Sequence, residues 1–334
     1  MTSQKTILIT GPYLDSDAAA LAAEHGFAVV HTPAYPSTDT LRAHLAEHAP
    51  FGVVSRMGRF EGAAMDSSPG LRVIAKHGAG VDNIDIAAAT ERGILVTRAA
   101  GGNAVSVAEH AVAMIMAAVK RVVPMDKRLR DGHWDKPTHV GRELRGMRVG
   151  LVGSGAIGTE TVKLCQAIGM SVGIYDPYAP ANAFADLGVT RFDSLEGCLG
   201  GSDVVSLHCP LTSETRHLLN ARTIGLMPEG SYLVNTARGG LIDEAALKDA
   251  LDNGHLAGAA LDTFEAEPPK EHLPLFDCPN AILTPHVAGV TAEAGRRVGL
   301  MAVESIIAIA EGAGLAPARM VNADVLAEPA PSHN

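Results

Sequence analysis

The sequence predicts an α/β protein built from two doubly wound parallel sheets. Short apolar runs rich in Val, Ile and Leu alternate with Ala- and Leu-rich amphipathic stretches along most of the chain. Runs without polar alternation are typical of strands buried on both faces, which occur in parallel sheets covered by helices. The length of 334 residues suits about two domains, and a turn-rich break at Ala99-Ala-Gly-Gly-Asn103 separates two such series.

The first series occupies roughly residues 1–98 and predicts a sheet of its own. Its strands are expected at Thr6–Thr10, Phe27–His31, Phe51–Ser55, Arg72–Lys76 and Ile94–Thr97. Amphipathic stretches at Asp15–His25 and Thr38–His48 predict helices between the first three strands. After the break, Ser106 and Glu109 match a capping box, so a long helix is expected over residues 106–121.

The second series begins at Arg148 and predicts a second sheet. Its strands are expected at Arg148–Val152, Ser171–Tyr175, Val204–Leu207, Tyr232–Asn235, Ala257–Leu261 and Ala281–Leu283. The amphipathic stretches predict helices at Ala156–Ile168, Glu244–Asn253 and Thr291–Glu311.

The composition argues against several classes of function. A net charge of −10 with 13 aromatic residues offers neither the basic field nor the stacking surface of a nucleic-acid binder. The longest apolar stretch, Ala111–Val119, is too short to span a membrane. The four cysteines are far apart, so we expect no disulfide framework, no metal site and a cytoplasmic location.

Residues 120–148 form a basic segment that contains Trp134, the single tryptophan of the chain. Three interpretations remain open for this segment. It could be a solvated helix face, a contact between subunits anchored by Trp134, or, least in keeping with the net charge, a nucleic-acid contact.

A glycine motif indicates a dinucleotide site. The strand at 148–152 runs into Gly153-Ser-Gly155-Ala156-Ile157-Gly158, and an amphipathic helix follows. Gly153 permits the tight turn, Gly155 lets the backbone approach a pyrophosphate, and Gly158 lets the helix pack against the strand. The free N–H groups of the first helical turn would face the phosphates.

An acidic residue supports the same interpretation. Asp176 directly follows the next strand, eighteen positions after Gly158, where its carboxylate can accept hydrogen bonds from ribose hydroxyls. Pro177 and Tyr178 follow it, so no cation is adjacent to neutralise a 2′-phosphate. The sequence therefore favours NAD as the cofactor.

Three polar groups follow predicted strands and suggest acid–base chemistry on a carboxylic acid. Arg238 follows a strand and precedes two glycines, and its planar guanidinium suits a carboxylate. Glu267 and His286 together make a pair of an orienting carboxylate and an imidazole, a common device for general acid–base catalysis. Each of these residues alone could equally be a structural or surface group.

Several motifs together resemble the D-2-hydroxyacid dehydrogenase family, nearest its D-3-phosphoglycerate dehydrogenase branch. The resemblance extends over about residues 50–310. Beside the glycine motif, the segments that carry it are Lys76-His-Gly-Ala-Gly-Val-Asp-Asn-Ile-Asp85, His208-Cys-Pro-Leu-Thr-Ser-Glu-Thr-Arg216, Asn235-Thr-Ala-Arg-Gly-Gly240, Leu261-Asp-Thr-Phe-Glu-Ala-Glu-Pro268 and Thr284-Pro-His-Val-Ala-Gly289.

The resemblance implies an NAD-dependent enzyme that moves a hydride between the nicotinamide and C2 of a small D-2-hydroxy acid or 2-keto acid. Arg238 would bind the substrate carboxylate, His286 would exchange the proton at the C2 oxygen, and Glu267 would hydrogen-bond His286. It also implies cofactor contacts from Val107, Cys209, Pro210, Thr236, Ala237, Asp262, His286, Ala288 and Gly289.

The N-terminal half would supply the rest of the substrate site. By the same resemblance, Ala79, Gly80 and Val81 would cradle the substrate carboxylate with backbone N–H groups. Arg56 and Arg59 follow a predicted strand and could hold a distal phosphate, sulfonate or carboxylate, although both could equally be solvated.

The resemblance further implies a division of the chain. A Rossmann-like nucleotide domain at residues 101–288 would be inserted into a flavodoxin-like substrate domain made of 1–100 and 289–334, and the protein would be a homodimer. Two alternatives stay open: an NAD(H)-sensing binding protein on the same fold, and a formate dehydrogenase relative. Glu267 argues against the latter, which would pair its histidine with Gln.

Overall fold

The computed structural model describes residues 4–180 and 182–326. The described residues group into two compact units. The first unit contains those up to Asn103 and those from Val290 onward, and the second unit runs from Ala104 to Gly289. No helix in the described ranges has the length and apolar character that crossing a bilayer requires.

The first unit is a five-stranded parallel sheet in the order β2-β1-β3-β4-β5. This doubly wound order is the flavodoxin-like arrangement. Its strands are β1 (Lys5–Ile9), β2 (Phe27–His31), β3 (Gly52–Ser55), β4 (Val73–Lys76) and β5 (Leu95–Arg98).

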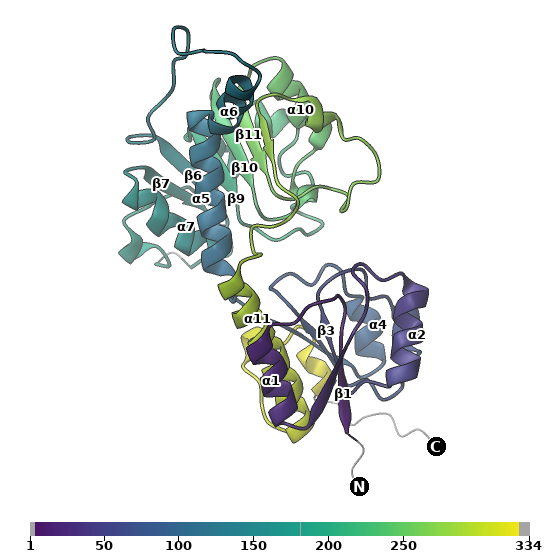
Figure 1. Cartoon of the computed structure of the whole chain (residues 1–334). Helices are drawn as coiled ribbons and strands as arrows, with labels where there is room; N and C mark the ends of the chain where they lie inside the picture. The colour runs from purple at the N-terminus through teal and green to yellow at the C-terminus, as the bar shows by residue number, and fades with distance from the viewer. Residues whose placement is uncertain (1–3, 181, 327–334) are drawn as a thin grey trace. The chain divides into compact units, whose positions relative to one another are not determined.

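Helices cover both faces of this sheet (Figure 1). On one face α1 (Ser16–Glu24) and α11 (Ala292–Glu311) enclose a core, and on the other α2 (Thr38–His48), α3 (Gly62–Met65) and α4 (Ile86–Glu91) enclose a second. Because both faces of every central strand are buried, the strands read as unbroken apolar runs.

The second unit is a seven-stranded parallel sheet in the order β12-β11-β10-β9-β6-β7-β8. The strand order reverses beside β6, the arrangement of a dinucleotide-binding fold. The strands are β6 (Arg148–Val152), β7 (Ser171–Tyr175), β8 (Thr190–Arg191), β9 (Val204–Leu207), β10 (Ser231–Asn235), β11 (Leu256–Leu261) and β12 (Ala281–Leu283).

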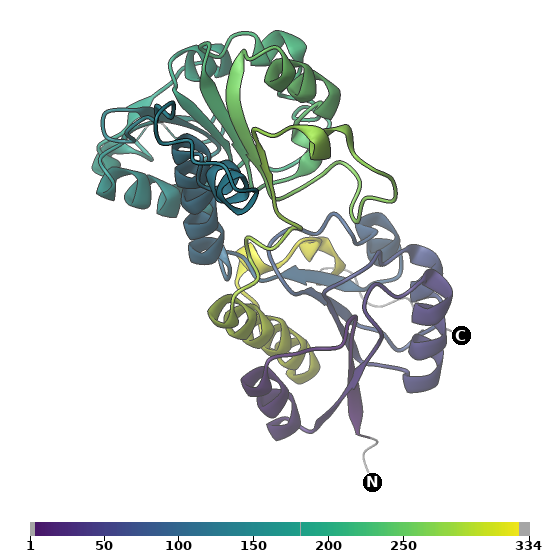
Figure 2. The same cartoon turned by 45° about the horizontal axis from the view of Figure 1, so that its top comes forward.

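Two helical layers also enclose the second sheet, as Figure 2 shows from another side. One core lies under α5 (Ala104–Lys120) and α7 (Ala156–Ala167). The other lies under α8 (Leu195–Gly200), α9 (Ala221–Ile224) and α10 (Glu244–Asp252). The predicted class of two parallel-sheet α/β units is confirmed.

Three local features differ from the sequence-based expectations. The long helix α5 begins at Ala104 rather than at residue 106, so Ser106 lies inside its first turns, buried, and the predicted capping box is wrong. The edge strand β8 was not predicted because its two residues are exposed and carry no apolar run. Helix α6 (Val122–Arg130) was not predicted because it buries no residue.

Candidate active site

The predicted polar residues of the second unit follow successive strands of one parallel sheet. Gly153 follows β6, Asp176 follows β7 and Cys209 comes shortly after β9. The segments containing Arg238, Glu267 and His286 follow β10, β11 and β12, respectively. Because all these strands run in the same direction, the groups gather at the carboxyl edge of the sheet, where open α/β sheets bind ligands.

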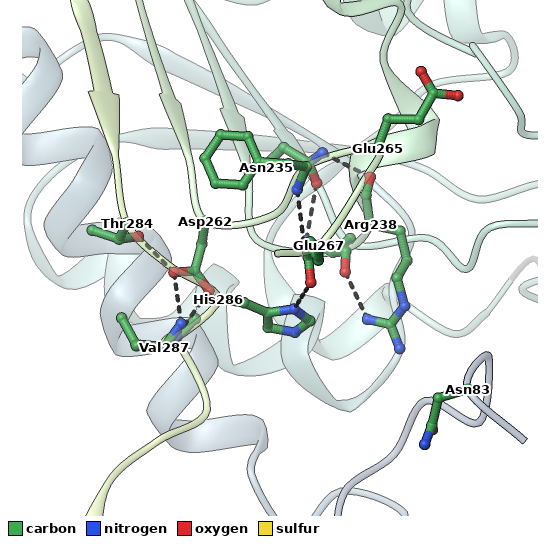
Figure 3. Close-up of polar contacts among 12 residues, drawn as sticks. Asn83, Asn235, Arg238, Asp262, Glu265, Glu267, Thr284, His286 and Val287 are labelled. Atoms are coloured by element: carbon green, nitrogen blue, oxygen red, sulfur yellow. Dashed lines mark hydrogen bonds and ion pairs between the residues drawn. The ribbon is translucent and has the colours of Figure 1, made fainter. Parts of the chain in front are cut away.

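Glu267 and His286 form a direct pair. The imidazole Nδ1 lies 2.5 Å from Glu267 Oε2, and the other carboxylate oxygen accepts a hydrogen bond from the Phe264 backbone N–H at 2.8 Å (Figure 3). The carboxylate is therefore held from two sides. The His286 side chain is 49% exposed, so the imidazole remains accessible to a small ligand.

The Arg238 segment is shaped by Asn235, the last residue of β10. The Asn235 amide donates to the Arg238 carbonyl at 2.8 Å and its oxygen accepts from the Ala237 N–H at 2.9 Å. The Arg238 guanidinium donates to the Ala237 carbonyl at 2.7 Å. In Figure 3 this guanidinium lies beside the Glu267–His286 pair.

Direct backbone contact holds the Arg238 segment against the Glu267 segment. A Cβ atom on Gly239 would lie 1.9 Å from the carbonyl carbon of Phe264 and 2.3 Å from the Glu265 nitrogen. Only glycine permits two main chains to approach so closely. Gly239 therefore sets the spacing between the segments that carry the guanidinium and the carboxylate.

The loop that presents His286 is fastened by Asp262. His286 itself has φ 52°, a left-handed conformation that is unusual for a residue with a side chain. Asp262 is fully buried and its carboxylate accepts from the Thr284 hydroxyl at 2.5 Å and from the Val287 and Ala288 N–H groups at 2.9 and 2.8 Å. The structure thus places Asp262 beneath this loop.

The glycine motif has the shape that a pyrophosphate requires. Cβ atoms on Gly153 and Gly158 would meet backbone at 2.8 and 2.6 Å, whereas a Cβ on Gly155 would meet nothing within 4 Å. The open side of Gly155 leaves room for a ligand to approach the main chain at the start of α7. Ala156 and Ile157 form the first turn of that helix.

Asp176 lies beside this turn, at the end of β7. Its Oδ2 accepts from the Ser154 N–H at 2.9 Å and from the Ser154 hydroxyl at 2.7 Å, and Oδ1 accepts from the Tyr178 N–H at 3.0 Å. Burial works to raise the pKa of Asp176, but these donors outweigh it and hold the pKa below its ordinary value. The group is a fixed anion that can accept from hydroxyls.

Other residues predicted to line the cofactor site also lie along this edge. Thr236 is buried, and among the described residues its hydroxyl oxygen has no hydrogen-bond partner. Burial raises the pKa of the Cys209 thiol to about 11, so the thiol is neutral. Pro210 is exposed and Val107 is buried in α5. An unsatisfied buried hydroxyl, an open glycine and a fixed carboxylate fit a bound NAD.

The predicted substrate residues Arg56, Ala79, Gly80 and Val81 belong to the first unit, where they follow β3 and β4. The Arg56 guanidinium donates to the Tyr13 carbonyl at 2.8 Å. Burial lowers the pKa of Arg56 from its ordinary value. No carboxylate of residues 4–180 and 182–326 forms an ion pair with Arg56.

Two residues that contribute to the second-unit site were missed by the sequence interpretation. Ser154, an unspecified position of the glycine motif, fixes Asp176. His110 lies 3.2 Å from the Thr284 hydroxyl. The sequence could have indicated His110 through its spacing, because it comes three positions after Val107 and therefore lies on the same face of α5.

Comparison with known proteins agrees with this geometry. The family model described as D-isomer specific 2-hydroxyacid dehydrogenase, NAD binding domain, matches residues 112–288. The chain is 40% identical over 260 residues to the D-3-phosphoglycerate dehydrogenase of Archaeoglobus fulgidus, an alignment that covers 78% of this chain and 49% of that protein. It is also 40% identical over 272 residues to the glyoxylate reductase of Thermofilum pendens, with 80% of each chain covered.

A solved structure is similar over almost the full chain. D-lactate dehydrogenase from Escherichia coli matches with a TM-score of 0.80 and 29% identity, covering 95% of this chain and all of that one. The present chain spans about half the length of the phosphoglycerate dehydrogenases it matches.

The family match extends over more than half of the chain and lies within the second unit. It coincides with the glycine motif, the acidic residue after β7 and the polar groups at the sheet edge. The second unit is therefore an NAD-binding domain, and the chain belongs to the D-isomer specific 2-hydroxyacid dehydrogenase family.

Proposed function

We propose that this protein is an NAD-dependent D-2-hydroxyacid dehydrogenase. It would interconvert a small D-2-hydroxy acid and the corresponding 2-keto acid, with 3-phosphoglycerate and the hydroxypyruvate/glycerate pair as the leading candidates. The observation that carries the proposal is the Glu267–His286 pair, 2.5 Å apart, beside Arg238 on a unit that binds NAD. An imidazole, an orienting carboxylate and a guanidinium are the groups that proton exchange on an anionic hydroxy acid requires.

The pair determines which imidazole nitrogen acts on the substrate. Since Glu267 binds Nδ1, that nitrogen carries a proton and Nε2 is the exchanging atom. In oxidation, neutral Nε2 accepts the hydroxyl proton from the substrate. In reduction, the imidazolium returns it to the C2 oxygen, and the Glu267 carboxylate stabilises the positive ring.

Arg238 would bind the substrate carboxylate and stabilise charge on the C2 oxygen. When bound, NAD supplies the hydride acceptor and NADH the donor. The cofactor would be held by Gly153, Gly155 and Gly158 at its pyrophosphate and by Asp176 at its ribose. Val107, Thr236, Asp262 and the segment from Cys209 to Pro210 would line the remaining groove, together with Ala237, Ala288 and Gly289.

The first unit also contains groups that suit an anionic substrate. Gly78 has φ 142°, a conformation for which glycine is suited, and it precedes the proposed backbone cradle of Ala79, Gly80 and Val81. Arg56 is a half-buried cation without an acidic partner among the described residues, which suits an anionic distal group on the substrate.

The experiment that tests this function is a panel of 2-keto acids and 2-hydroxy acids followed by NADH absorbance. We expect turnover that depends on the acid, on one enantiomer of the hydroxy acid and on His286. Binding of NADH without turnover of any member would instead support an NAD(H)-sensing binding protein.

We also propose a cytoplasmic homodimer. The segment from α6 to Val140 exposes several large apolar side chains, which monomers rarely leave in water together. They are Val122, Val123, Leu129, Trp134 and Val140. Trp134→Ala should shift the sedimentation profile toward monomer, and a profile identical to that of the unaltered chain would contradict this contact.

A further inference from the structure

We propose that His110 is a positioning residue of the active site, acting through Thr284 and Asp262 on the loop that presents His286. The inference rests on the proposed function for the role of His286. Its structural basis lies wholly within the second unit. His110 belongs to α5, Asp262 follows β11 and Thr284 follows β12, so three separate elements meet at this point.

The loop needs external support because of its backbone conformation. His286 is held in the left-handed region at φ 52°, which persists only where surrounding contacts enforce it. Three consecutive N–H groups are fixed by one residue: that of His286 by the Asp262 carbonyl at 2.8 Å, and those of Val287 and Ala288 by its carboxylate. The direction of the imidazole therefore depends on where the Asp262 carboxylate lies.

Among the described residues, no cation lies at hydrogen-bond distance from the Asp262 carboxylate. Its side chain is 1% exposed, and the nearest basic nitrogen is His110 Nε2, 3.7 Å from Oδ1. A buried carboxylate requires donors to offset the loss of water. Its third donor, besides the two backbone N–H groups, is the Thr284 hydroxyl at 2.5 Å.

The direction of each hydrogen bond follows from the chemistry of the groups. An ionised carboxylate only accepts, so the single proton of the Thr284 hydroxyl points to Asp262. The Thr284 oxygen can then only accept from His110 Nε2, which lies 3.2 Å away. His110 Nε2–H thus donates to the Thr284 oxygen, and the Thr284 hydroxyl donates to Asp262. The Asp262 carboxylate also accepts from the Val287 and Ala288 N–H groups of the loop.

In this arrangement His110 acts as a hydrogen-bond donor to Thr284 and does not merely fill space in the core. Its side chain is 24% exposed, whereas Val112 and Ile115 of the same helix are buried in the core. Removing the His110 donor leaves the Thr284 oxygen without this hydrogen bond, which weakens the coupled bond from the Thr284 hydroxyl to Asp262. The Asp262 carboxylate then holds the loop amides less firmly, and the position of the His286 imidazole becomes less well defined.

The test compares variants that keep or remove each donor. His110→Phe keeps a ring without an N–H, His110→Gln keeps an N–H donor, and Thr284→Val removes the hydroxyl at nearly constant volume. Glu109→Gln, at an exposed position of the same helix, is the matched control. Hydrogen exchange of the Val287 and Ala288 amides is measured for each, together with kcat and KM.

We expect amide exchange about tenfold faster or more in His110→Phe and in Thr284→Val, the effect of losing one hydrogen bond. In both, kcat should fall by a similar factor while KM for NADH stays constant. The double variant should be no worse than Thr284→Val alone, and His110→Gln should recover most of the loss. Glu109→Gln should match the unaltered chain.

Exchange rates in His110→Phe within twofold of the unaltered chain would overturn the proposal, as would equal effects of Phe and Gln at this position. Should His110→Phe not fold, Thr284→Val provides the same comparison. Because amide exchange requires no turnover, the result is independent of the proposed enzymatic activity. A chain that turned over no hydroxy acid would refute the proposed function and leave the exchange measurement valid.

Discussion

Gly239 offers the sharpest test of how the active site is assembled. In Gly239→Ala the new Cβ would lie 1.9 Å from the Phe264 carbonyl carbon and 2.2 Å from its oxygen. Real Cβ atoms essentially never approach other heavy atoms below 3.0 Å, so the two main chains must separate by at least about 1 Å. Backbone on both sides means that no flexible side chain can absorb the clash.

The separation moves the guanidinium of Arg238 away from the Glu267–His286 pair. A displacement of about 1 Å in a catalytic arrangement costs roughly 100-fold in rate. We therefore expect kcat/KM for the best 2-keto acid to fall by about that factor. Overpacking should also lower the free energy of unfolding by about 1–3 kcal/mol, measured by urea denaturation.

Gly240→Ala is the matched control within the same motif. Its Cβ would meet the end of the Leu211 side chain at 3.0 Å, which can rotate away. The control should keep activity within a few-fold of the unaltered chain. Equal activity of Gly239→Ala and the unaltered chain would refute the claim that this close approach sets the geometry of the site.

Three further predictions concern single groups. His286→Asn should reduce kcat by about 10²–10⁴-fold with NADH affinity unchanged, measured by turnover and fluorescence titration; near-normal turnover would remove His286 from its role. Asp176→Ala should weaken NADH binding by roughly tenfold to 100-fold and reduce the preference for NAD over NADP, and an unchanged preference would argue against the ribose contact. Burial lowers the pKa of His208 in the folded protein to about 4. In the unfolded chain this imidazole takes up a proton already near pH 6.5, so the unfolded state binds more protons between the two values. The free energy of unfolding should therefore fall as pH decreases from about 6.5 to 4, and should fall less in His208→Asn; the same pH dependence in both proteins would contradict this.

Much of the fold could be predicted because it depends on neighbours along the chain. Buried parallel strands read as short apolar runs, and the predicted bounds of β6, β7 and β9 agree with the structure. The glycine motif and Asp176 could be located for the same reason, since strand, turn and helix follow one another directly. The exposed helix α6 and the short edge strand β8 have no such pattern, and they were missed.

The start of α5 shows a limit of local patterns. Ser106 and Glu109 have the spacing of a capping box, yet the helix begins at Ala104 and Ser106 is buried within it. Packing of the helix against the sheet overrides the local preference of serine for a helix start.

The sequence by itself determined the parallel α/β class, the family and the segments that carry the chemistry, because each is written in residues close together in the chain. Only the tertiary structure decided that Gly239 touches the Phe264 backbone, and that His110 meets Thr284, 174 residues further on. Such contacts depend on the lateral order of strands and on helix packing. Those are set by the burial of many side chains at once rather than by any short segment.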